Sequence, residues 1–252
     1  MDRTRPKPLV IFSLLALGAL MPLLAPGALR AQAPLEKEGP AETTEASAPV
    51  YKPPLRGAPG GRVGGASRSA VRVAAPLPTI ELLAPADHAG QTTSAAPTLY
   101  FFASQAVAWP MQLTISAPLQ PAPVLEVTIP SAPAPGIYGL RLADYRVRLE
   151  PGIVYTWSVS IVLEPRAWSR NIVASAAILR NPSEPAVERA MPATARTRQP
   201  GLLAQAGLWY DAVASAAELQ ELDRHAALDR LLEQVGLVEL ARNDRLRASG
   251  TR

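Results

Sequence analysis

Apolar side chains recur at every second position through the middle of the chain, as in strands that bury one face. In the longest run Tyr155, Trp157 and Val159 point to one side, and Thr156 and Ser158 point to the other. Strand-like runs of this kind are Thr98–Phe102, Met111–Ser116, Val124–Ile129, Tyr138–Leu142, Arg146–Leu149, Ile153–Leu163 and Ile172–Leu179. Because no helical pattern separates them, we expect an antiparallel, immunoglobulin-like β-sandwich over residues 79–180.

The apolar spacing changes to three and four residues after position 200, which predicts helices. One stripe runs through residues 203–217 and a second through residues 228–235, with Gly236 placed to end the second helix. Such a hairpin, over residues 201–241, is too small to bury its own stripes. We therefore expect it to dock on the sandwich through Trp209 and Tyr210. The predicted fold class is mainly β with a C-terminal α part.

The segments that flank these patterns have the composition of linkers. Residues 34–78 contain 8 prolines and 6 glycines in 45 positions, which leaves too few large apolar groups for a core. We expect a disordered linker there, a second linker over residues 181–200, and a disordered arginine-rich tail over residues 242–252.

The first 33 residues have the pattern of a secretory signal peptide. Arg3, Arg5 and Lys7 precede an apolar stretch that ends near small residues at Ala31 and Ala33. Cleavage is the favoured interpretation, with a retained membrane anchor as the alternative. Because this segment carries a net charge of +3, the +4 of the whole chain falls to +1 after cleavage. We expect an exported, periplasmic or secreted protein that does not bind nucleic acid.

Residue types that support catalysis are scarce. The chain has no cysteine and only two histidines, so disulfides, thiolate metal sites and cysteine nucleophiles are excluded. We expect His88 to be a solvated loop residue and His225 to lie on a helix surface. Four scattered acids could meet as a glycosidase pair, although their spacing does not require it: Glu126, Asp144, Glu150 and Glu164. No catalytic residue, cofactor or metal site is predicted.

Arginines and loop tryptophans are the candidate interaction residues. Arg56, Arg62 and Arg68 stand among glycines in the linker, where they would favour an anionic partner. Trp109, Arg166, Trp168 and Arg170 stand in predicted loops, where an indole can stack on a sugar ring and a guanidinium can bind an acidic group. For both tryptophans the favoured interpretation is a lid over one end of the core, and a binding role is the alternative.

Three stretches resemble the uncharacterised bacterial family called domain of unknown function 928, whose members are secreted. The first is the Gly-Arg stretch Arg56–Arg68, and the second is Leu149–Gly152 with Tyr155 and Trp157. The third is Gly207–Ala212 followed by Leu231–Leu237. The resemblance runs from about Leu55 to Ala241, and it departs from the family where Ala167 and Trp168 precede Ser169. It implies architecture and export, but no activity.

We therefore expect a non-enzymatic interaction or structural module of the cell envelope. Its partner would be an envelope protein or an anionic polymer, and only the signal segment before cleavage would contact the membrane. A glycan- or envelope-polymer-binding module is the alternative. A hydrolase with paired carboxylates is the third and least favoured hypothesis.

Overall fold

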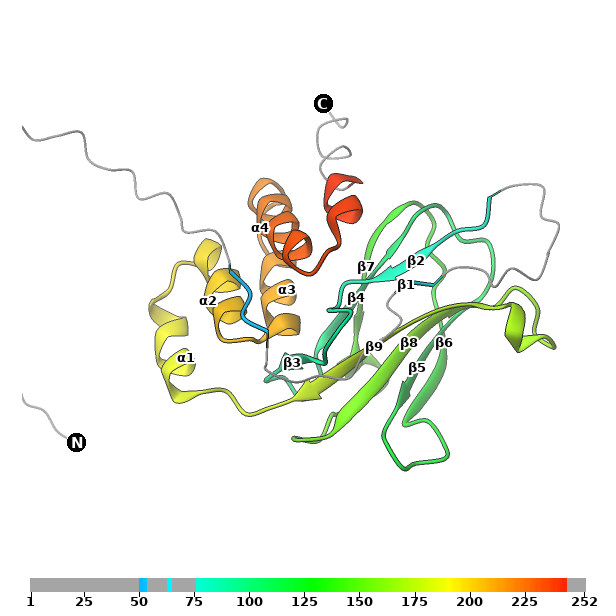
Figure 1. Ribbon diagram of the computed structural model, residues 1–252, viewed down its shortest axis with the longest axis horizontal. Coiled ribbons are helices and arrows are strands. Elements are labelled where there is room, and N and C mark those ends of the chain that lie inside the picture. The colour runs from blue at the N-terminus through cyan, green and yellow to red at the C-terminus, as the bar shows by residue number, and fades with distance from the viewer. Residues whose placement is uncertain (1–49, 54–62, 65–75, 244–252) are drawn as a thin grey trace, which may run out of the picture. The chain divides into compact units, whose positions relative to one another are not determined.

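The computed structural model describes residues 50–53, 63–64 and 76–243. Strands occupy the part up to residue 180, and helices follow it (Figure 1). The expected signal peptide and the residues 244–252 of the expected tail lie outside the described residues, as does most of the expected 34–78 linker. No helix in the described ranges is long and apolar enough to cross a membrane.

The first sheet has four strands in the order β1-β2-β4-β7. They are β1 (Val63–Gly64), β2 (Ile80–Leu82), β4 (Thr98–Ala103) and β7 (Gly136–Arg141). Every neighbouring pair in this sheet is antiparallel.

The second sheet has five strands in the order β3-β9-β8-β5-β6. They are β3 (Gly90–Thr92), β9 (Ile172–Arg180), β8 (Val154–Ile161), β5 (Met111–Ser116) and β6 (Leu125–Ile129). Its pairs are antiparallel except for β3 and β9, which run parallel. The prediction of a mainly β fold with a C-terminal α part is confirmed, and the expected antiparallel arrangement holds for every pair but β3–β9 among the described strands.

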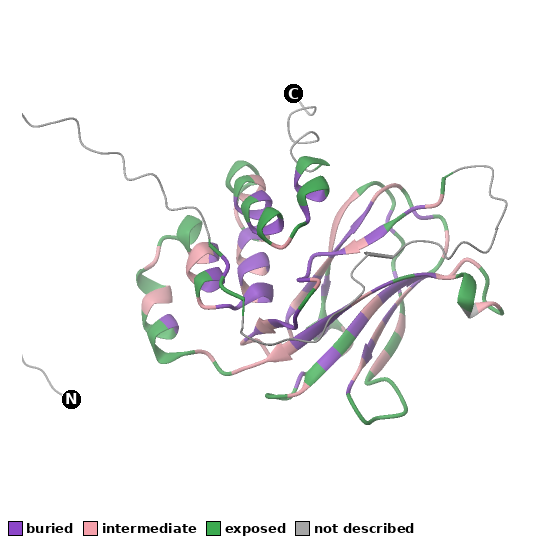
Figure 2. Cartoon of the chain, in the orientation of Figure 1, coloured by how far each residue is buried: buried purple, intermediate pink, exposed green. Residues whose placement is uncertain are grey.

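The period-2 pattern places apolar side chains of both sheets in one core (Figure 2). Along β5 buried and half-buried residues alternate strictly, and Trp157 and Val159 of β8 are completely buried. From the first sheet, Leu99 and Phe101 of β4 join the same cluster. The alternation therefore identified the inward faces correctly, because a strand turns successive side chains to opposite sides.

The helical part comprises α1 (Pro185–Ala190), α2 (Gln199–Gln205), α3 (Trp209–Ala217) and α4 (Glu221–Gln234), followed by a helical stretch at 238–243. The short 3₁₀ turns are η1 (Leu142–Tyr145), η2 (Trp168–Arg170), η3 (Met191–Ala193) and η4 (Arg196–Arg198).

Trp209 and Tyr210, at the start of α3, attach the helices to the β-region. The indole N–H of Trp209 donates to the Leu83 carbonyl at 2.9 Å. The Tyr210 hydroxyl accepts from the Trp157 indole at 2.8 Å and donates to the Ala177 carbonyl at 3.1 Å. Both side chains are fully buried in the common core, so the two residues expected at this contact do form it.

Three predicted elements differ in the structure. Residues 146–149 form no strand, because the chain leaves η1 through Arg146 in the left-handed conformation (φ +58°). The expected 181–200 linker contains α1, whose Pro185 stands in its first turn. The first helical stripe is divided between α2 and α3 by Gly207 (φ +77°).

Residues 50–53, here called the N-terminal strap, are folded against the helices although they belong to the expected linker. The Tyr51 N–H donates to Gln234 Oε1 at 2.6 Å, and the Lys52 N–H donates to the Ala204 carbonyl at 3.0 Å. The Tyr51 side chain is only 7% exposed. A single aromatic residue therefore gives this proline-rich stretch an anchor that its composition does not reveal.

Candidate functional site

Two loops meet at one end of the five-stranded sheet. In the register of the sheet Met111, the first residue of β5, pairs with Ile161, the last residue of β8. Beyond this pair the Val162 N–H donates to the Pro110 carbonyl at 2.9 Å. The β4–β5 loop (104–110) and the β8–β9 loop (162–171) are therefore neighbours, and we call this surface the loop end.

The loop end holds several of the residues predicted to interact. Arg166 is exposed, and Arg170 donates through Nη1 to Glu164 Oε2 at 2.6 Å, with both side chains about half exposed. Trp109 is half-buried and packs against the core, which favours the lid interpretation for this residue. Trp168 lies in η2, but its side chain is outside the described part.

The arginines of the expected linker are not described. Arg56, Arg62 and Arg68 lie outside the described residues. Of the predicted interaction residues, the structure therefore brings Trp109, Arg166 and Arg170 to one surface.

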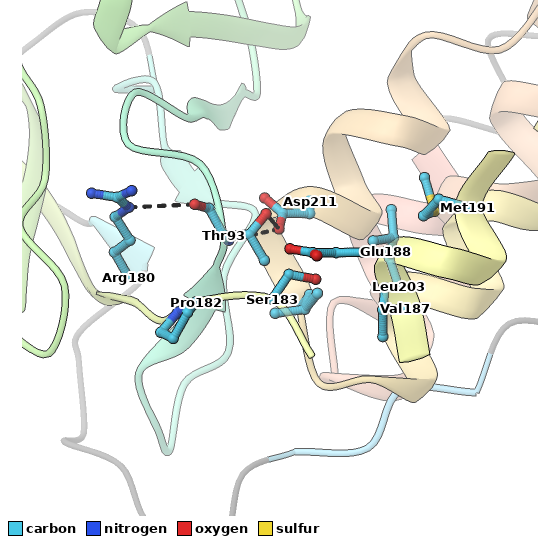
Figure 3. Close-up of a pocket in the computed structure, with 10 residues that line it drawn as sticks. Thr93, Arg180, Pro182, Ser183, Val187, Glu188, Met191, Leu203 and Asp211 are labelled. Carbon is cyan, nitrogen blue, oxygen red and sulfur yellow. Dashed lines mark hydrogen bonds between the residues drawn. The ribbon is translucent and has the colours of Figure 1, made fainter. Parts of the chain in front are cut away.

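A cavity of about 630 Å³ lies at the opposite end of the same sheet, where β9 ends and the helices begin (Figure 3). It is lined by Thr93, Arg180, Pro182, Ser183, Val187, Glu188, Met191, Leu203, Leu208 and Asp211. These residues come from the turn after β3, the end of β9 and the segment that follows it, α1, η3, α2, and the start of α3 with the residue before it.

Asp211, in the first turn of α3, organises the polar wall of this cavity. Its Oδ1 accepts from the Thr92 hydroxyl at 2.5 Å, and its Oδ2 accepts from the Thr93 N–H at 2.7 Å and the Thr93 hydroxyl at 2.9 Å. Asp211 is half-buried, because α3 turns this side of the helix toward β3. The carboxylate ties the start of α3 to the sheet.

Arg180, the last residue of β9, closes the other side of the polar wall. Its Nε donates to the Thr93 carbonyl at 3.3 Å, and its Nη1 donates to the Leu149 carbonyl at 3.0 Å. The guanidinium therefore satisfies two loop carbonyls, and in Figure 3 it is turned away from Glu188.

The remaining wall is apolar apart from one acid. Val187, Leu203 and Leu208 are buried side chains that line the cavity from α1, α2 and the residue before α3. Glu188 of α1 points its carboxylate toward Asp211 and Ser183 (Figure 3). The cavity thus combines an apolar wall with a wall rich in hydrogen-bond acceptors.

His88 is buried, with 7% of its surface exposed, so the expectation of a solvated loop histidine is wrong. Its Nδ1 lies 2.7 Å from Asp87 Oδ1, and its Nε2 lies 2.7 Å from the Tyr51 hydroxyl. Burial, and then the Asp87 carboxylate, raise the pKa of Tyr51, which keeps the phenol protonated. In the tautomer that donates from Nδ1 to Asp87, Nε2 accepts a hydrogen bond from the Tyr51 hydroxyl, so these two hydrogen bonds hold the strap against the β2–β3 loop.

Three of the four acids considered for a glycosidase pair contact separate partners. Glu126 accepts from Gln112 at 2.7 Å, Asp144 from Arg141 at 3.1 Å, and Glu164 from Arg170. Among the described residues no group of three or more His, Asp or Glu side chains is arranged to hold a metal ion.

The residues of the cavity could not be selected from the sequence. Thr93 and Asp211 are 118 positions apart, and Leu149 and Arg180 are 31 apart. The one local signal was an acid in the first turn of a helix that follows Gly207, and that position is also common for a solvated acid.

The comparisons with known proteins bear on the family of the chain. A comparison with curated proteins and a comparison with solved structures each return no match. The family model described as Domain of Unknown Function (DUF928) matches residues 63–245. This range covers both sheets, both ends of the five-stranded sheet and the four helices, and leaves out the N-terminal strap. The chain therefore belongs to the DUF928 family.

Proposed function

We propose that the protein is an exported, non-enzymatic interaction module of the cell envelope that binds an acidic partner at its loop end. The observation that carries the proposal is the register of β5 and β8, which gathers the β4–β5 and β8–β9 loops and exposes Arg166 there. The helices occupy the other end of the sheet and leave these loops unobstructed by α1–α4 (Figure 1). An exposed guanidinium binds carboxylate or phosphate groups through charge-assisted hydrogen bonds.

Two features support the finer assignment of an immunoglobulin-like sandwich. The five-stranded order β3-β9-β8-β5-β6, with β3 parallel to β9, is compatible with that fold. Near the start of β8 the Tyr155 hydroxyl accepts from the Glu150 N–H at 3.2 Å, five residues upstream, as in the tyrosine corner of immunoglobulin domains. Loops gathered at one end of such a sandwich commonly serve recognition.

Export is the second part of the proposal, and it rests on the amino-terminal sequence. A basic head, an apolar stretch and small residues near position 33 are what a signal peptidase substrate needs. Mass spectrometry of the protein recovered from the envelope fraction should find an N-terminus near residue 32 or 34. Recovery of the full-length chain from the cytosolic fraction would contradict export.

A matched pair of charge reversals tests the binding surface. Arg166 at the loop end and Arg148 at the opposite end of the sheet are both exposed. We expect Arg166→Glu to reduce two quantities: the retention of the protein on immobilised alginate, and the amount of envelope protein that the purified chain captures. Arg148→Glu should leave both quantities unchanged. Equal losses for the two variants would show a general charge effect and overturn the assignment. Retention on uncharged dextran would instead favour the glycan-binding alternative.

A further inference from the structure

The cavity between β9 and the helices has two chemically different walls. Val187, Met191, Leu203 and Leu208 form an apolar wall, and Thr93, Arg180, Ser183 and Asp211 form a polar wall, toward which Glu188 points from α1 (Figure 3). Its volume of about 630 Å³ lies within the range of cavities that hold small ligands. A ligand that fits both walls needs an aliphatic body and a polar end.

The polar wall is built to accept hydrogen bonds. Asp211 already receives three, so its orientation is fixed by Thr92 and Thr93. A carboxylate has about four acceptor positions, so Asp211 keeps one available. Glu188 projects toward the same space from α1 (Figure 3). Two carboxylates that face one space favour a cation there.

The positive charge of Arg180 does not reverse the preference of the cavity for a cation. Its guanidinium donates to the carbonyls of Thr93 and Leu149 and is turned away from Glu188 (Figure 3). The electrostatic complement of the polar wall is therefore a hydrogen-bond donor with positive charge.

We infer that this cavity binds a primary ammonium group at the end of an aliphatic stem. The stem packs on Leu203, Leu208 and Val187, and the ammonium donates its three N–H bonds to Glu188, Asp211 and the Ser183 hydroxyl. A free alkylamine and a lysine side chain share this chemistry. The cavity and the loop end lie at opposite ends of the sheet. A negative result for ammonium binding in the cavity would therefore not contradict the proposed function of the loop end.

Titration of the ¹⁵N-labelled full chain with n-hexylammonium tests the inference. We expect saturable amide shifts at Thr93, Ser183, Glu188 and Leu203, and about tenfold weaker binding of 1-hexanol and of hexanoate, which lack the cation. Nα-acetyl-lysine methylamide in a parallel titration distinguishes the two sources. Binding of both cations assigns the cavity to a lysine side chain, whereas binding of hexylammonium alone assigns it to a free amine.

Two glutamate substitutions on α1 and its N-terminus provide the matched control. Glu188→Gln should weaken hexylammonium binding about three- to fivefold, as expected for loss of one partly exposed ion pair. Glu184→Gln removes an exposed acid that does not line the cavity and should leave the affinity unchanged. Equal binding of hexanol and hexylammonium, stronger binding of hexanoate, or no saturable shift at these four amides would overturn the inference.

Discussion

Asp211 shows how one side chain can join two elements that are far apart in the sequence. Its carboxylate accepts from two hydroxyls and one backbone N–H of Thr92 and Thr93, and Thr92 is completely buried. A buried donor that loses its acceptor is left with the full free-energy penalty of desolvation, because no hydrogen bond compensates for the lost water. Asp211 is therefore a residue on which both the stability of the fold and the shape of the cavity depend.

Substitution of Asp211 should be costly although the residue is only half-buried. Asp211→Asn replaces one acceptor oxygen by a donor that faces the donors of Thr92 or Thr93, so we expect a loss of about 1–3 kcal/mol in the free energy of unfolding. Urea denaturation followed by circular dichroism measures this loss. Asp223→Asn, an exposed acid in the first turn of α4, should change stability by only a few tenths of a kcal/mol. Similar values for the two variants would contradict the assigned role.

At the scale of elements, aromatic side chains connect segments that are distant along the chain. Tyr51 from the strap packs edge-to-face on Trp209 of α3, with ring centroids 4.9 Å apart. The same ring lies beside His88, between β2 and β3. The strap, the β2–β3 loop and α3 therefore stabilise one another, and the strap is part of the folded unit.

Removal of the Tyr51 ring should destabilise the whole described unit. Tyr51→Ala leaves a cavity beside Trp209 and removes the hydroxyl that hydrogen-bonds His88, so we expect a loss of about 3–5 kcal/mol. Guanidinium denaturation followed by tryptophan fluorescence reports this loss. The neighbouring Val50 is 51% exposed, so Val50→Ala should cost less than about 0.5 kcal/mol. A small effect of Tyr51→Ala would show that the strap is dispensable.

At the scale of the molecule, the described strands and helices share one hydrophobic core. Trp157 from the second sheet, Phe101 from the first and Trp209 from α3 all belong to it. Two of its phenols are also sensitive to alkaline pH. Burial raises the pKa of Tyr210 and Tyr51 above the ordinary value of 10.0, and Asp87 adds to the effect at Tyr51.

The protein should therefore lose stability above pH 10. Below that pH both phenols are protonated in the folded and unfolded chain, so they add no pH dependence. Above it the unfolded chain releases these protons while the folded chain retains them, and the free energy of unfolding falls by up to about 1.4 kcal/mol per pH unit for each phenol.

Urea denaturation at pH 8, 10 and 11 measures this slope. Tyr51→Phe should make the slope less steep, because it removes one of the two phenols whose pKa the fold raises. Identical slopes in the parent chain and in Tyr51→Phe would contradict the explanation.

Whether a strand could be predicted from the sequence depended on its length. The runs that became β5, β8 and β9 are six to nine residues long, enough to display a period of two, and their bounds lie within two residues of those expected. β2 and β3 have three residues each, too few for any period to be visible. For the candidate site, loop context selected Trp109, Arg166 and Arg170, but only strand register placed them together.

The sequence by itself determined the mostly antiparallel character of the sheets, the C-terminal helices, and the aromatic pair that attaches those helices. These follow from periods and spacings within a short stretch of chain, where neighbouring side chains decide which face is apolar. Only the tertiary structure decided that Asp211 accepts hydrogen bonds from Thr92 and Thr93, that His88 is buried beside Tyr51, and that an acceptor-rich cavity opens beside Arg180. Each of these depends on atoms contributed by elements that are 30 to more than 100 residues apart, and their meeting is governed by packing of the whole core.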